Sequence, residues 1–274
     1  MFAGFAKVII SRGTREILFV RILLLLIFLI ILSNISVLEA QDSSLIITHP
    51  VDGLSVESGL RYLAIKDEYI SREKYSGSTS FLALDWTKYH ETYYFHLDMD
   101  LINNAKIKNY NVTSYESEFD LNLSYLYPIG ALTVLNRKAH FYLGPMAEFF
   151  DHYGYQNIAM LSPSRTLLIS AGIRIDMLYP IGRRWDIESH MQSTIISIDQ
   201  GESSDASTGI TTSQGTIITL LSGLRYSFSA QVRYLLIKNI SIRAGYLYNL
   251  VRSTAWDYFI SSSDNLTASL TYSF

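Results

Sequence analysis

The stretch Tyr93-Tyr94-Phe95-His96-Leu97-Asp98-Met99-Asp100-Leu101 decides the fold class of this chain. Its odd-numbered residues are all apolar or aromatic, whereas the even-numbered ones include His96, Asp98 and Asp100. A period of two is typical of a β-strand, because successive side chains point to opposite faces of a sheet. The stretch therefore predicts a strand with one apolar face and one charged face.

The same alternation recurs after residue 53 and predicts ten strands, with no helix-period segment competing. The predicted strands are Leu54–Ala64, Leu82–Trp86, Tyr93–Leu101, Phe119–Tyr127, Ala139–Phe149, Leu167–Tyr179, Trp185–Ile195, Leu220–Leu236, Ile240–Leu250 and Leu266–Phe274. Eight or twelve strands remain alternatives, if Leu220–Leu236 is divided or if the second strand lies outside a membrane.

The apolar faces of these strands are free of charge, and this decides which way they point. In a soluble sandwich such faces form the core. On the lipid face of a transmembrane barrel a charge costs about 2 to 4 kcal/mol at the midplane, while charges are tolerated in the lumen. We therefore expect an all-β fold, a closed antiparallel up-and-down barrel over residues 54–274, with its apolar face toward lipid.

The predicted connections alternate in length. Three are short: Tyr89–Glu91, Pro180–Arg184 and Lys238–Asn239, with Pro128–Lys138 intermediate. Five are long and polar: Lys66–Gly77, Ile102–Ser117, Asp151–Arg165, Asp199–Gly215 and Arg252–Asp264. Short turns at one end and long loops at the other are typical of barrels with periplasmic turns and extracellular loops.

The first forty residues have the layout of a secretory signal peptide. Basic residues precede the apolar run Ile22–Leu32, and small and polar residues then lead to Ala40. We expect cleavage near Ala40, followed by a periplasmic N-terminal tail over residues 41–53. An uncleaved anchor starting at Ile17 is the alternative, but it places Arg21 inside the membrane at a cost of about 2.5 to 3.5 kcal/mol.

Composition limits the function classes. The chain has 274 residues, 49% hydrophobic and 17% charged, with 20 Tyr, no Cys and a net charge of -3. These values exclude a disordered chain and a disulfide scaffold, and they give no electrostatic footprint for nucleic acid. The many tyrosines fit a membrane interface, where amphipathic rings are favoured.

The ending Asn265–Phe274 resembles the last strand of Gram-negative outer-membrane β-barrels. In that family alternating apolar residues and a terminal Phe form the signal read by the barrel-assembly machinery. The resemblance assigns this signal to Leu270, Tyr272 and Phe274. Together with the leader it covers the whole chain and implies export to the bacterial outer membrane. The partners then expected are the assembly machinery, outer-membrane lipid and lipopolysaccharide.

Charged residues on the other strand faces are expected to meet in the lumen, acidic on one wall and basic on the opposite wall. The predicted lumen network comprises Arg61, Asp85, Asp98, Asp100, Glu118, Asp120, Glu148, Arg174, Asp176, Glu188, Arg225, Arg233 and Arg243. In a narrow barrel such residues form a plug of paired charges. The alternative is a narrow channel for small polar solutes, in which opposed charged walls orient the solute.

We expect no enzyme and no cofactor. Asp98 and Asp100, with Glu188 and His190, weakly resemble the acidic and Asp-x-His pairs of omptin proteases. Here the second pair begins with Glu and lies inside a strand, so an outer-membrane hydrolase ranks third. We find no His-x-Ser pair for nucleophilic attack and no metal-ligand spacing.

The predicted loops carry aromatic residues beside charges, a composition suited to sugars, lipopolysaccharide or protein. These residues are Tyr69, Tyr75, Tyr110, Tyr115, Tyr153, Tyr155, Trp256 and Tyr258. The alternative is that the rings only mark the outer membrane interface. Function is therefore expected to lie in the exposed loops, acting in a structural or surface-interaction role with an unidentified extracellular ligand.

Overall fold

The computed structural model describes residues 52–67, 74–90, 92–109, 112–156, 163–204, 211–219, 224–253 and 259–274. The predicted signal peptide and residues 41–51 of the predicted tail lie outside these ranges. Among the described residues, no helix is long and apolar enough to cross a membrane.

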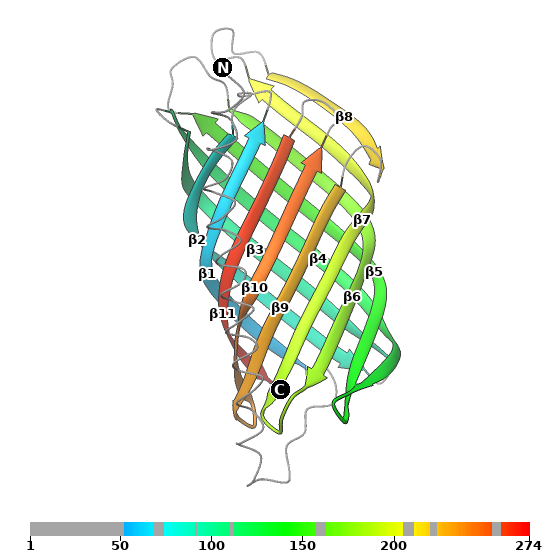
Figure 1. The fold of residues 1–274 in the computed structure, drawn as a ribbon. Helices are drawn as coiled ribbons and strands as arrows, with labels where there is room; N and C mark the ends of the chain where they lie inside the picture. Colours follow the sequence, from blue (N-terminus) through cyan, green and yellow to red (C-terminus); the bar gives the residue numbers. More distant parts are fainter. Residues whose placement is uncertain are drawn as a thin grey trace, which may run out of the picture. The chain divides into compact units, whose positions relative to one another are not determined.

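Eleven β-strands make up the regular structure of the described residues. They are β1 Gly53–Asp67, β2 Lys74–His90, β3 Tyr93–Asn109, β4 Val112–Val134, β5 Arg137–Gln156, β6 Ser164–Pro180, β7 Trp185–Ser204, β8 Thr211–Thr219, β9 Leu224–Ile237, β10 Ile240–Ser253 and β11 Phe259–Ser273. All neighbouring strands pair antiparallel, and the β1–β11 and β6–β7 pairings close the sheet (Figure 1).

The closed barrel has ten strand positions. Strands β8 and β9 pair with successive parts of β7: β8 pairs with residues 196–204 and β9 with residues 185–193. The two strands therefore occupy one position in the barrel. The predicted all-β, ten-stranded antiparallel barrel is confirmed, and eight or twelve strands are not needed.

The barrel carries its apolar side chains outside over its lower part, nearer the short turns. Leu60 is 64% exposed on the outer face of β1, whereas the next residue, Arg61, is 3% exposed in the lumen. On β11 the outward Leu270 is likewise exposed, while Ser269 and Thr271 beside it are buried. Because adjacent residues alternate between faces, the period of two sets both surfaces at once.

Most of the predicted long loops are in fact strand. The predicted loop Ile102–Ser117 lies in β3 and β4, except for residues 110 and 111, which are not described. The reason is an inversion of the pattern at the end away from the short turns. There the outward residues Lys106 and Lys108 are polar and exposed, whereas the inward Ile102 and Ile107 are fully buried.

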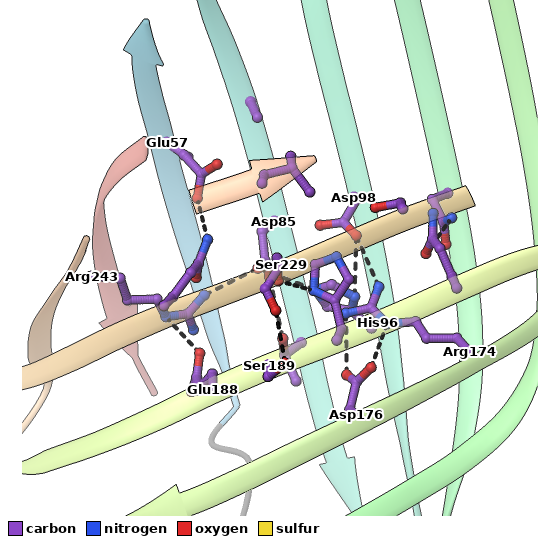
Figure 2. A pocket seen from close by; sticks show the side chains of 18 of the residues that line it. Glu57, Asp85, His96, Asp98, Arg174, Asp176, Glu188, Ser189, Ser229 and Arg243 are labelled. Atoms are coloured by element: carbon purple, nitrogen blue, oxygen red, sulfur yellow. Dashed lines mark hydrogen bonds and ion pairs between the residues drawn. The ribbon is translucent and has the colours of Figure 1, made fainter. Parts of the chain in front are cut away.

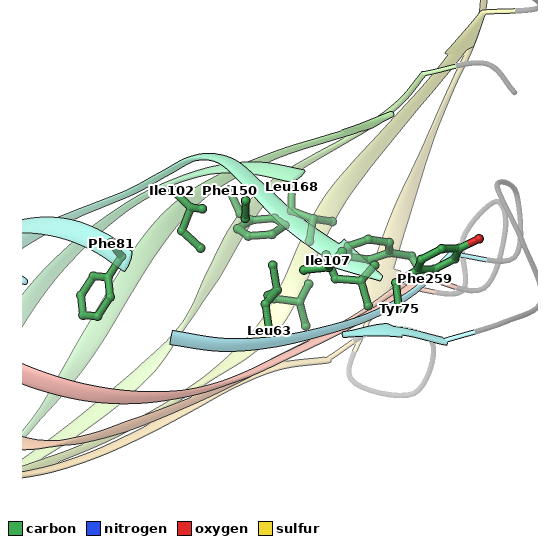
Figure 3. Packing of buried hydrophobic residues seen from close by; sticks show 11 residues of the cluster. Leu63, Tyr75, Phe81, Ile102, Ile107, Phe150, Leu168 and Phe259 are labelled. Carbon is green, nitrogen blue, oxygen red and sulfur yellow. The ribbon is translucent and has the colours of Figure 1, made fainter. Parts of the chain in front are cut away.

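An apolar cluster fills the lumen at this end, as Figure 3 shows. Its core includes Leu63, Phe81, Ile102, Phe150 and Phe259, which come from five different strands. On β1 to β3 this part of the barrel has an apolar inside and a polar outside, which is the arrangement of a water-soluble β-structure, whereas on β7 and β8 the outward Ile198 and Ile217 stay apolar and exposed. The sequence prediction assigned Ile102 and Phe259 to loops, because apolar residues point inward at this end and not outward.

The prediction that Pro128–Lys138 forms a connection is also wrong. Strand β4 continues to Val134, and only Leu135 and Asn136 form the turn. Both have positive φ angles, 47° and 63°, as a two-residue type I′ hairpin requires. The hairpin extends past β3, because the β3–β4 pairing begins with Tyr94 beside Leu126.

The aromatic residues predicted in loops have other locations. Tyr75 is buried in β2, while Tyr115 lies on β4 and Tyr153 and Tyr155 lie on β5. The remaining four, Tyr69, Tyr110, Trp256 and Tyr258, lie outside the described residues.

Candidate functional site: the charged lumen

Inward residues from the lower part of the barrel, nearer the short turns, meet in one charged cluster at the middle of the lumen. The strand register brings them together: Asp98 on β3 lies beside Asp85 on β2 and Asn122 on β4. Charged side chains at alternate positions of neighbouring strands therefore share one level of the lumen. We call this set of inward charges and their partners the lumen cluster.

Three arginines cross or line the lumen and each contacts two carboxylates. Arg174 Nε lies 2.7 Å from Asp176 Oδ1, and its Nη1 lies 3.0 Å from Asp98 Oδ2. Arg225 Nε lies 3.1 Å from Glu148 Oε1, and its other arm pairs with Asp120. Arg61 pairs with Asp100 and lies 3.5 Å from Glu118.

Two more arginines complete the cluster nearer the turns. Arg233 Nη2 lies 2.9 Å from Asp186 Oδ2, and its Nη1 lies 2.7 Å from Glu188 Oε1. Arg243 Nη1 lies 3.2 Å from Asp85 Oδ2, and its Nε lies 3.2 Å from Glu188 Oε2 (Figure 2). Glu188 therefore bridges both guanidinium groups.

The structure places all the predicted lumen residues in these ion pairs. They are Arg61, Asp85, Asp98, Asp100, Glu118, Asp120, Glu148, Arg174, Asp176, Glu188, Arg225, Arg233 and Arg243. Sequence reasoning omitted Glu57, His96, Asp186 and His190 from this set. The inward phase of their strands was the signal that could have included them.

A cavity of about 140 Å³ lies within the lumen cluster. Its lining includes Glu57, Asp85, His96, Arg174 and Arg243 (Figure 2). The apolar cluster of Figure 3 adjoins the Arg61 and Arg225 pairs. Both guanidinium groups also lie over its rings, Arg61 at 4.6 Å from Phe81 and Arg225 at 4.7 Å from Phe150.

His96 lies between two carboxylates, and the ligand atoms of Asp85, His96 and Asp98 all lie within 4.8 Å of one another. Its Nε2 is 3.1 Å from Asp85 Oδ2 and its Nδ1 is 3.4 Å from Asp98 Oδ2. Those same two oxygens already accept from Arg243 and Arg174. A cation bound there would lie beside two guanidinium groups, so the described geometry favours an ion-pair network.

His190 and Ser229 form a contact that sequence reasoning missed, because the residues are far apart in the chain. His190 Nδ1 lies 2.7 Å from Ser229 Oγ, the geometry of a nucleophile and its base. Ser229, however, lies within β9, which pairs with β7 and β10 on its two sides. The nearby backbone N–H groups belong to these ladders, so they are not free to stabilise an oxyanion.

The residues of the predicted assembly signal lie together on the outer face of the barrel. Leu270, Tyr272 and Phe274 are all more than half exposed, and the rings of Tyr272 and Phe274 are 6.4 Å apart. Strand β11 pairs with β10 on one side and with β1 on the other. The last strand of the chain is thus paired with the first, which closes the barrel.

Comparisons with known proteins identify the fold and no family. No protein-family model matches the chain, and no curated protein matches it. Outer membrane protease OmpT from Escherichia coli is structurally similar, with a TM-score of 0.54 and 11% identity over 85% of this chain and 99% of that one.

Two other solved structures match with lower scores. Neisserial surface protein A has a TM-score of 0.36 and 12% identity over 82% of this chain and 100% of that one. The translocator domain of autotransporter NalP from Neisseria meningitidis has a TM-score of 0.40 and 11% identity over 83% and 90% of the two chains. At these identities the likeness concerns the barrel fold alone.

Proposed function

We propose that this chain is a bacterial outer-membrane β-barrel with a non-conducting lumen, acting in a structural or surface-interaction role through the part that projects from the membrane. One observation carries this proposal: five arginines, each bound to two carboxylates, occupy the lumen beside a buried apolar cluster. Paired charges and packed apolar side chains leave little room for a hydrated solute.

The exposed apolar surface of the lower part of the barrel supports the outer-membrane location. A belt of exposed apolar residues surrounds a polar interior, which is stable only if lipid covers the belt. Strands of 14 to 23 residues, β8 aside, also exceed the roughly 9 to 11 needed to cross a bilayer. The surplus length supports a folded extension beyond the membrane, and this extension replaces the predicted long loops as the functional surface.

A protease activity is not part of the proposal, although one structurally similar protein is a protease. Asp98 and Asp100 are bound by Arg174 and Arg61, and Glu188 is bound by Arg233 and Arg243. Carboxylates held in this way stabilise the interior and are not free to activate a water molecule.

Conductance of the purified, folded chain in a planar lipid bilayer tests the proposal against the channel alternative. We expect insertion without a steady ion current, while heat-modifiable gel mobility of the same sample shows that the barrel is folded. A steady current that changes in Arg225→Gln or Asp98→Asn would establish a channel and overturn the proposal.

A further inference from the structure

The outer face of β3 to β6 carries a group of aromatic and basic side chains beyond the apolar belt. The rings of Tyr115 on β4 and Tyr155 on β5 are stacked, with centroids 5.0 Å apart and an interplanar angle of 12°. The ring of Tyr153 lies 6.2 Å from that of Tyr155. Tyr153 is 42% exposed and Tyr155 is 38% exposed, so these rings present an open aromatic surface.

Basic residues flank the rings in the strand register. Lys106 on β3 lies directly beside Tyr115, and Lys108 lies two residues further along β3. Arg165 on β6 lies beside Tyr153. All three basic residues are exposed. We call the six residues Lys106, Lys108, Tyr115, Tyr153, Tyr155 and Arg165 the aromatic-basic patch.

Local contacts hold the patch in place without cancelling its charge. Arg165 binds Asp151 through two hydrogen bonds of 2.8 and 2.7 Å. The hydroxyl of Tyr155 donates to Asn104 Oδ1 at 3.3 Å, next to the irregular stretch of β3 between Ile102 and Ala105. Two acidic residues lie beside Arg165, Asp151 in contact and Glu202 on β7 in the strand register, so the positive charge of the patch is concentrated at Lys106 and Lys108.

The height of the patch relative to lipid follows from the strands that carry it. The rings of Phe119 and Phe149 lie 6.1 Å apart on the outer face and end the apolar run of β4 and β5. Tyr115 is four residues beyond Phe119. At about 3.4 Å per residue it lies roughly 14 Å along the tilted strand from the last lipid-facing ring. This is the level of lipid headgroups and their sugars.

Other parts of the rim differ in chemistry. Beyond Leu82 on β2 the outward residues are Ser80, Ser78 and Ser76, and beyond Leu266 on β11 they are Asp264 and Ser262. These faces offer hydroxyls and an acid, whereas the face over β3 to β6 offers rings and cations. Stacked rings and exposed basic residues lie side by side on the face over β3 to β6, and this combination suits a ligand that has both sugar rings and phosphates.

We propose that the aromatic-basic patch binds the phosphorylated sugar headgroup of an outer-leaflet glycolipid. The tyrosine faces pack on sugar rings, Lys106, Lys108 and Arg165 bind phosphate oxygens, and the acyl chains lie on the apolar belt below. The inference rests on the proposed outer-membrane location and names the partner of the projecting surface.

Binding of purified lipid A to the full, folded chain in detergent micelles tests the inference. The central comparison is wild type against Lys106→Gln/Lys108→Gln, measured with bisphosphorylated lipid A. We expect the double variant to bind at least fivefold more weakly, and raised salt to weaken wild-type binding. Lys138→Gln, an exposed lysine near the β4–β5 turn, is the matched control expected to stay within twofold of wild type.

The nature of the ligand is tested with two further lipids. Dephosphorylated lipid A and phosphatidylglycerol should both bind at least fivefold more weakly than bisphosphorylated lipid A. Equal binding of phosphatidylglycerol, equal binding of the dephosphorylated lipid, or an unchanged affinity of the double variant would each overturn the inference. A folded, non-conducting barrel with no lipid A preference would remove this inference alone, whereas a conducting barrel that binds lipid A would remove only the proposed closed lumen.

Discussion

Arg225 lies where three interactions of the lumen meet. It pairs with Asp120 and Glu148, and its guanidinium lies 4.7 Å from the ring centre of Phe150. The carboxylate of Glu148 is fully buried, so it has no solvent to replace this partner. A buried charge that loses its counter-ion is among the costliest defects a fold can contain.

We therefore predict that Arg225→Met lowers the free energy of unfolding by about 3 to 5 kcal/mol. Urea titration of the barrel in detergent micelles, followed by gel mobility and tryptophan fluorescence, measures the change. Arg165→Gln is the control, because Arg165 pairs with Asp151 at the surface and exposed pairs contribute about 1 kcal/mol or less. Equal losses in the two variants would contradict the assigned difference between lumen and surface pairs.

At the residue scale, the alternation of the sequence is enough to say which charges face inward. It does not say which arginine binds which carboxylate, because Arg61 and Asp100 come from strands that are not neighbours. Such contacts depend on barrel closure and on side-chain length. The pairing of His190 with Ser229 was missed for a related reason, since it depends on the register between β7 and β9.

The turn between β4 and β5 shows local strain at the element scale. Leu135 has a φ of 47° and is 85% exposed, so a branched apolar residue occupies a left-handed position with little packing to compensate. Asn is better tolerated in this conformation than Leu, and Asn-Gly is the preferred pair for a type I′ turn.

Leu135→Asn is predicted to raise the free energy of unfolding by about 0.5 to 1 kcal/mol, because it relieves this strain. The same urea titration detects the gain. Leu132→Asn serves as the matched control, since Leu132 is also exposed but lies within β4. If both variants gave the same gain, reduced surface hydrophobicity would explain the effect in place of turn geometry.

The last strand gives a prediction about assembly. Phe274→Asp is expected to reduce the folded fraction in the outer membrane several-fold, because it alters the exposed row formed by Leu270, Tyr272 and Phe274. Heat-modifiable mobility of membrane fractions measures folding in cells. Leu135→Asp changes an exposed apolar residue near the β4–β5 turn, outside the last strand, and should fold at near wild-type levels. Wild-type folding of Phe274→Asp would remove the assigned role of this strand.

At the element scale, the alternation of the sequence located the part of most strands that has an apolar outer face but not the full length of these strands. The prediction for β3 ended at Leu101, whereas the strand continues to Asn109. Up to Leu101 the outward residues are apolar; beyond it, Lys106 and Lys108 are polar while Ile107 turns inward. Inward and outward residues still alternate beyond Leu101, but here the apolar residues point inward. A search for one constant apolar face therefore interprets this stretch as a loop.

For the whole molecule, this change of phase divides one barrel into two environments. The lower part has apolar residues outside and charges inside, as lipid requires. The upper part has Leu63, Ile102 and Phe150 inside and Lys106 and Ser78 outside, as water requires. In the proposed location a single closed sheet passes from lipid into water, and the lumen contents change along it from ion pairs to an apolar cluster.

The accessibility of spin labels along β4 in lipid vesicles tests this account most directly, and the absence of native cysteine makes single-cysteine labelling straightforward. Labels are placed at Phe119, Leu121, Leu123 and Tyr125 on the outer face, and at Asn122 and Ser124 in the lumen. We predict that oxygen dissolved in the lipid relaxes the outer labels strongly, and that a water-soluble nickel complex relaxes neither set. Strong relaxation of the Asn122 and Ser124 labels by the nickel complex would show a water-filled pore. Strong relaxation of the outer labels by the same complex would show that lipid does not cover the apolar belt. Either result would contradict the account.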